Sequence, residues 1–180
     1  MTTELNFEPF LGEVAEPPRV SRYAVNEAMI RNWVEAHEDE NPVYVDRETA
    51  RATGRTDIIC PPAMISTWVM AGLRRFREIH RKREAGEVED FAYSRLMAVL
   101  DEAGYTSVVA TNVDQEYVRE LHPGDEVTCH FTIESVVGPK TTGLGEGYFI
   151  TLDKRYVDQH GEPLVNEKFR ILRFRPGSNQ

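Results

Sequence analysis

The chain has 180 residues, of which 41% are hydrophobic and 28% charged, so it has the length of one domain and no apolar run long enough to span a membrane. Its 30 acidic and 21 basic residues give a net charge of -9, which argues against nucleic acid or anionic lipid as partners. Two cysteines are too few for a disulfide framework and the N-terminus lacks a signal-peptide pattern, so we expect a cytoplasmic protein.

The first third of the chain predicts a lead-in and two helices. Residues 1–20 contain three prolines and no hydrophobic period, so we expect them to be irregular. Asn26 can cap a one-sided helix, which Pro42 cannot continue because proline has no amide proton. Asp46 can then cap a short helix, and Gly54 can provide its left-handed exit.

The middle of the chain predicts a long helix and a polar excursion. Proline suits a first helical turn, so a helix is expected to begin at Pro62. Its apolar side chains continue past Trp68, and the pattern to His80 would give a central helix about 27 Å long at 1.5 Å per residue. Residues 78–95 are rich in both charges, so we expect a polar excursion there.

Beyond Gly104 the hydrophobic period becomes that of strands. Alternation and turn residues predict strands at 105–117, 127–134, 148–156 and 165–171. Because helices come first and hairpin-linked strands follow, we expect an α+β fold in which an antiparallel sheet is covered by the long helix.

The run DENPVYVD at residues 39–46, followed by Ala50 and Gly54, resembles the hydratase motif of the MaoC-like (R)-specific enoyl-CoA hydratases. Tyr44 stands where that family has its catalytic histidine. The segments ICPP at 59–62, LHPGD at 121–125 and GLGEGYF at 143–149 extend the resemblance over roughly residues 20–176. The chain is most similar to the MaoC-like domain of the larger, non-catalytic subunit of actinobacterial two-subunit hydratases for steroid side-chain CoA thioesters.

The resemblance implies a single hot-dog domain at residues 21–176, with a sheet wrapped around the central helix and a tail at 177–180. It also implies a heterodimer or heterotetramer with a second hot-dog subunit that carries the catalytic Asp/His pair. The larger subunits of this branch continue into another domain, through which an aldolase or thiolase-like partner could bind. No cofactor is implied beyond the coenzyme A of the acyl-CoA substrate.

The replacement of histidine by Tyr44 has a chemical consequence. Adding water to an unsaturated thioester needs a base for the water and an acid for the α-carbon. A phenol with an ordinary pKa of about 10 is a poor base near neutral pH. We therefore expect Asp39, Asn41 and Tyr44 to be the relic of a motif in an accessory subunit.

Three other interpretations stay open. Asp39 and Asn41 could simply form a helix-exit turn, since both side chains bond nearby backbone groups in such turns. The chain could be an autonomous hydratase or dehydratase that uses Asp39 with His37 or Tyr44, although a histidine on an apolar helix stripe is more often packed. It could also be a non-catalytic module that binds acyl-CoA or another enzyme.

Further residues are candidates for binding. The resemblance suggests that acyl groups contact Pro62, Met64 and Trp68 and that the backbone at Gly145 and Gly147 approaches ligand. Arg119 and Lys140 are candidates for the CoA phosphates, since arginine forks fit phosphate oxygens. The basic cluster at 74–83 could also bind the CoA phosphates, or its cations could merely stabilise the C-terminus of a helix. Cys60 reads as a packed thiol, and the five histidines lack metal-ligand spacing.

Overall fold

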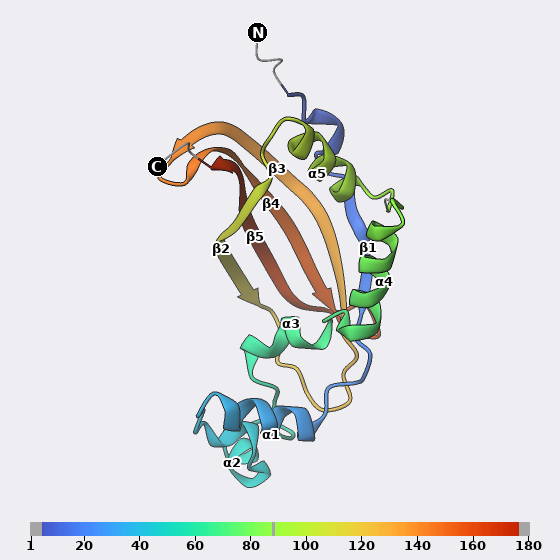
Figure 1. Cartoon of the computed structure of the whole chain (residues 1–180). Helices are drawn as coiled ribbons and strands as arrows, with labels where there is room; N and C mark the ends of the chain where they lie inside the picture. The colour runs from blue at the N-terminus through green and yellow to red at the C-terminus, as the bar shows by residue number, and fades with distance from the viewer. Residues whose placement is uncertain (1–4, 88, 177–180) are drawn as a thin grey trace.

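The computed structural model describes residues 5–87 and 89–176, so the expected tail at 177–180 lies outside the described residues. Five strands form one antiparallel sheet in the order β1-β3-β4-β5-β2 (Figure 1). The strands are β1 (Val14–Val20), β2 (Ser107–Tyr117), β3 (Thr128–Thr142), β4 (Gly145–Val157) and β5 (Pro163–Pro176). All four predicted strands are present, which confirms the α+β class.

The helices lie at one end of the sheet and along its β1 side (Figure 1). In chain order they are η1 (Glu8–Phe10), α1 (Glu27–Ala36), η2 (Pro42–Tyr44), α2 (Arg47–Ala52), η3 (Pro62–Met64), α3 (Ile65–Trp68), α4 (Gly72–Glu84) and α5 (Ala92–Glu102). No helix in the described part of the chain is long and apolar enough to cross a membrane.

The predicted caps of the first two helices are confirmed. The side chain of Asn26 accepts a hydrogen bond from the Met29 amide, and that of Asp46 accepts bonds from two amides of α2. Gly54 follows α2 with a φ of 89°, a left-handed value that glycine adopts without strain.

The expectation of an irregular lead-in at 1–20 is wrong for residues 14–20, which form β1. Pro17 and Pro18 argue against a strand in the sequence because proline cannot donate a hydrogen bond to the neighbouring strand. Here they lie on an edge strand, within an irregular stretch of the register between Glu16 and Arg19. An edge strand needs hydrogen bonds on one side alone, so it tolerates both prolines.

The expected central helix is also wrong as a single element. It ends at Trp68, and α4 begins at Gly72 with a φ of 70°. This φ is in the left-handed region, which glycine adopts without strain, so the sharp restart favours glycine. The break leaves Trp68 and Val69 in the core and places α4 on the surface.

The polar excursion at 78–95 is mostly helical, because it contains the end of α4 and the start of α5. The helix α5 is not among the predicted elements, although Ala92, Leu96 and Leu100 recur at four-residue steps and are all buried. Of the two longer helices on this side of the sheet, α5 contributes the larger buried face.

Candidate functional site

The motif segment is a turn held by its own side chains. The Asp39 carboxylate accepts a hydrogen bond from the Asn41 amide at 3.1 Å, and the Asn41 side chain accepts one from the Val43 amide at 3.3 Å. Asn41 thereby caps η2, which carries Tyr44. These bonds show that both polar residues shape the backbone, as the structural interpretation expects.

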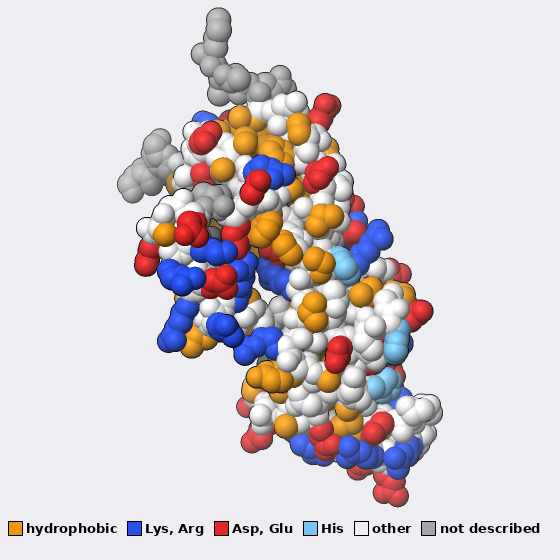
Figure 2. Space-filling view, turned by 90° about the vertical axis from the view of Figure 1, so that its right-hand side faces the viewer, with side chains coloured by type: hydrophobic (Ala, Val, Ile, Leu, Met, Phe, Trp, Pro, Cys, Tyr) orange, Lys and Arg blue, Asp and Glu red, His pale blue; other side chains and the backbone are white. Residues whose placement is uncertain are grey.

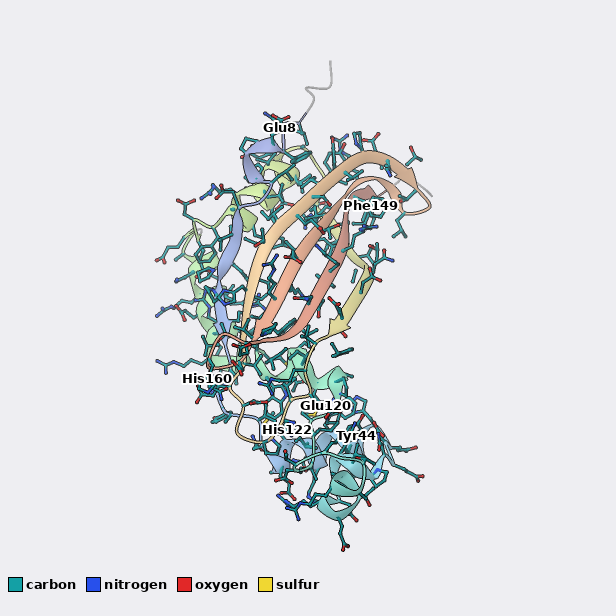
Figure 3. The ribbon with its side chains drawn as sticks, turned by 180° about the vertical axis from the view of Figure 1, so that it is seen from behind. Glu8, Tyr44, Glu120, His122, Phe149 and His160 are labelled. Atoms are coloured by element: carbon teal, nitrogen blue, oxygen red, sulfur yellow. The ribbon has the colours of Figure 1, made fainter. Side chains whose placement is uncertain are left out.

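Tyr44 lies half-buried in this turn, at the end of the molecule that contains α1 and α2 (Figure 3). Burial raises the pKa of the Tyr44 phenol, and the nearby Asp39 carboxylate raises it further. The phenol therefore stays protonated near neutral pH. It can donate a hydrogen bond, but it cannot act as the base that takes a proton from water.

Three separate segments meet behind the motif. The Val43 carbonyl accepts a hydrogen bond from the Ile59 amide at 3.3 Å, and the Cys60 amide donates to the Leu121 carbonyl at 2.8 Å. The Trp68 indole donates to the Cys60 sulfur at 3.3 Å. Three of the four segments that carry the family resemblance are thus hydrogen-bonded to one another.

Two of the three acyl-contact candidates are part of the core. Met64 is 1% exposed and Trp68 is 4% exposed, so neither faces an open surface. Pro62 is exposed and lines a small cavity of about 140 Å³. This cavity is also lined by Cys60 and the segment from Tyr117 to Leu121, so Pro62 lies near the motif.

The structure does not bring the two candidate glycines to the motif. Gly145 begins β4, and Gly147 lies two residues before Phe149, at the opposite end of the sheet from Tyr44 (Figure 3). A Cβ atom at Gly147 would lie 2.4 Å from the Arg173 carbonyl on β5. The close approach that requires glycine there is that of a neighbouring strand.

The candidate phosphate ligands are not gathered either. Arg119 donates to Asp125 at 3.0 Å and to Asp158 at 2.8 Å, so its guanidinium is occupied by two carboxylates. Lys140 is exposed on β3 and pairs with Gly147, far from Tyr44.

The basic helix α4 lies on the face shown in Figure 2, where cationic, acidic and apolar side chains are mixed. Arg75 and Lys82 both contact Glu89, at 2.7 and 3.1 Å. Part of the cluster at 74–83 is therefore neutralised within the chain.

Two histidines lie at the motif end of the molecule. His37 is exposed, and its ring stacks on Trp33 with centroids 3.9 Å apart and with Nδ1 at 2.8 Å from the Trp33 carbonyl. Sequence reasoning overlooked His122, whose Nδ1 lies 3.4 Å from the Ile58 carbonyl (Figure 3). The available signal was its position inside the LHPGD turn, where the other residues carried the resemblance.

Comparisons with known proteins agree on one family. The family profile named FAS1-like, dehydratase domain region matches residues 12–167. The chain is 44% identical over 173 residues to the probable enoyl-CoA hydratase alpha subunit of Thermomonospora curvata, covering 96% of this chain and 52% of that protein. It is 44% identical over 163 residues to the 3-oxo-4,17-pregnadiene-20-carboxyl-CoA hydratase alpha subunit of Mycobacterium tuberculosis. This match covers 90% of this chain and 49% of that protein. The chain spans about half the length of these curated relatives.

Solved structures show the same relationship. A chain in the ChsH1-ChsH2 complex from Mycobacterium tuberculosis superposes with a TM-score of 0.77 at 42% identity, over 91% of this chain and 86% of that one. The (R)-hydratase of A. caviae has a TM-score of 0.54 at 15% identity, over 91% and 97% of the two chains, which shows a shared fold.

Proposed function

Because the chain belongs to the FAS1-like dehydratase family of MaoC-like hot-dog proteins, we propose that it is the accessory, acyl-CoA-binding part of a heteromeric (R)-specific 2-enoyl-CoA hydratase. In this proposal a second hot-dog subunit supplies the catalytic Asp/His pair. The two chains together add water across the double bond of the thioester.

The observation that carries the proposal is Tyr44. The catalytic position holds a phenol whose pKa is raised by burial and by Asp39, so the site lacks a base there. The His37 ring stacks on Trp33 and its Nδ1 contacts the Trp33 carbonyl, so His37 does not replace the base that Tyr44 lacks. A relative at 42% identity was solved as part of a two-protein complex, which supports a partner for this chain.

The edge strand β2 offers a surface for that partner. It has neighbours on one side in the sheet, and ten of its eleven residues are exposed. Apolar side chains such as Val108, Val109 and Val113 lie among them. A long exposed edge with apolar residues is a surface that natural proteins normally cover. We infer that the second hot-dog subunit pairs along β2.

The acyl group is proposed to be bulky and apolar, as in steroid side-chain thioesters. The name of one relative supports this substrate class. The sheet surface near β2 also supports it, because Val113 and Tyr117 are 54% and 45% exposed where α4 and α5 do not cover the strand. We further propose that the reaction needs no metal or cofactor and that the two buried free thiols reflect a reducing compartment.

The proposal is tested by measuring hydration of a bulky 2-enoyl-CoA with this chain, with the second hot-dog subunit and with the two mixed. We expect turnover with the mixture and at most a trace with this chain. Full turnover by this chain alone would contradict the proposal.

The autonomous alternative is tested in the same assay with His37→Ala, His122→Ala and Tyr44→Phe. An autonomous base would cost about 10²-fold or more in rate when removed. We expect the hydration rate of the mixed complex to stay within about threefold of the wild-type rate for each variant, which is far less than that loss. Binding of the thioester without turnover in any mixture would instead favour a non-catalytic module.

A further inference from the structure

A chain of polar side chains crosses the inner face of the sheet from β4 to β2. The Lys154 ammonium donates to Glu167 at 2.6 Å, and the other carboxylate oxygen of Glu167 accepts from the Gln115 amide at 2.6 Å. The Gln115 carbonyl in turn accepts from the Tyr117 hydroxyl at 2.5 Å. These residues occupy adjacent positions on three neighbouring strands.

This polar chain lies among apolar groups. Glu167 is 4% exposed, and Lys154 lies 4.2 Å over the Phe169 ring. Val165, on the same face of β5, is fully buried. A buried ion pair often contributes no more to stability than apolar residues of the same size, because desolvation offsets the attraction. The burial of this pair is therefore weak evidence that its role is stabilisation alone.

At β2 the same cluster reaches an open surface. Gln115 is exposed, and its neighbours on this face, Val113 and Tyr117, are also exposed. A ligand lying on this surface would meet the apolar side chains of Val113 and Phe169 next to the Gln115 amide. Apolar side chains beside a few placed polar groups are the usual lining of a small-molecule site. Such sites are concave, and the second subunit proposed along β2 would supply the opposite wall.

The hydrogen-bond inventory defines what the ligand must offer. The Gln115 amide nitrogen has two protons, and one is used on Glu167. Within the described residues, no acceptor is found for its second proton. Because its carbonyl accepts from Tyr117 and its nitrogen is held by Glu167, the orientation of the amide is fixed. Its free group is a donor, which suits a carbonyl oxygen.

We propose that Gln115 is a specificity-determining residue that donates a hydrogen bond to a carbonyl oxygen on the acyl group, remote from the thioester. Glu167 and Tyr117 are positioning residues that hold the amide, and Lys154 holds Glu167. This inference rests on the proposed function, since it deepens the description of the acyl group that the hydratase accepts.

The test uses the assembled two-subunit complex and a pair of bulky enoyl-CoA thioesters that differ only in a ring ketone. With the wild type, kcat/KM should be about tenfold higher for the ketone, as expected for one hydrogen bond. Gln115→Leu should abolish this preference by lowering kcat/KM for the ketone about tenfold more than for the ketone-free thioester. Gln115→Asn, which keeps the amide but shortens its reach, should also lose the preference.

Glu116→Gln is the matched control, because Glu116 is the next residue of β2, lies on the opposite face and bonds Asn166. It should retain the preference. Equal losses with both substrates in Gln115→Leu, weakened assembly of that variant, or an unchanged ratio would each overturn the inference. A wild-type complex that hydrates neither thioester would contradict the proposed function, whereas one that hydrates both equally would contradict this inference alone.

Discussion

Three residues of the motif, Asp39, Asn41 and Tyr44, differ in what their side chains do in the turn. Asp39 and Asn41 each accept a hydrogen bond from a backbone amide two residues ahead, so both side chains shape the turn that precedes Tyr44. Tyr44 lies in the same turn, and its phenol stays protonated near neutral pH because burial and Asp39 raise its pKa. The polar residues of this turn therefore have a structural use that does not depend on the side chain of Tyr44.

Cys60 gives a prediction at the same scale. Burial raises the pKa of its thiol to about 12, although the hydrogen bond from Trp68 opposes the shift. Since the thiolate is the reactive form, a thiol with this pKa has about one thiolate in 10⁴ at pH 8. We expect no alkylation of Cys60 by iodoacetamide in the folded protein at pH 8.

Mass spectrometry of labelled peptides checks this result, with the urea-unfolded chain as the control in which Cys60 reacts. Because the pKa is raised, reactivity should increase only as the pH rises toward about 12. Rapid labelling of Cys60 at pH 8 in the folded chain would show that the thiol is activated.

At the scale of elements, the fold depends on where helices and strands are allowed to break. The restart at Gly72 keeps Trp68 buried and turns α4 outward. The start of β4 depends on another glycine, since Gly147 lies against Leu172, Arg173 and Phe174 of β5. Gly147 is required by the neighbouring strand, whereas Gly72 is favoured by its own left-handed backbone conformation.

Gly147→Ala should therefore lower the free energy of unfolding. Its added Cβ would lie 2.4 Å from a backbone carbonyl, which cannot move without shifting β5. Overpacking of this kind costs about 1–3 kcal/mol. The matched control is Gly143→Ala in the preceding turn, where an added Cβ would have no atom within 4 Å. Urea unfolding of the two variants measures the difference, and equal stability would contradict the packing at Gly147.

At the scale of the whole molecule, the two edges of the sheet differ. The edge strand β1 lies beside the helices α4 and α5, whereas β2 is exposed along nearly its full length (Figure 1). One row of side chains crosses the outer face from Val109 on β2 through Leu172 and Phe149 to Val137 on β3. The two ends of this row are partly exposed, but only Val109 lies on the open edge.

A charge at this edge should block the proposed assembly. We expect Val109→Glu to weaken binding of the second subunit at least about tenfold, because it would bury an unpaired carboxylate between the chains. Val137→Glu carries the same change at the other end of the row and should bind normally. Sedimentation of each variant with the second subunit measures the effect, and normal assembly of Val109→Glu would exclude β2 as the contact.

The sequence by itself determined the features that depend on neighbouring residues. The caps at Asn26 and Asp46, the turn at Asn41 and the alternation of the strands each involve bonds or periods that extend over a few residues. The ordered motifs were also enough to indicate the family.

Only the tertiary structure decided the features that depend on distant segments. β1 becomes a strand because it pairs with β3 more than 100 residues later, and Arg119 is neutralised by Asp158, 39 residues away. The chain from Lys154 to Gln115 exists only because β4, β5 and β2 lie side by side. Such contacts follow from how the chain packs, since local propensities do not encode which surfaces meet.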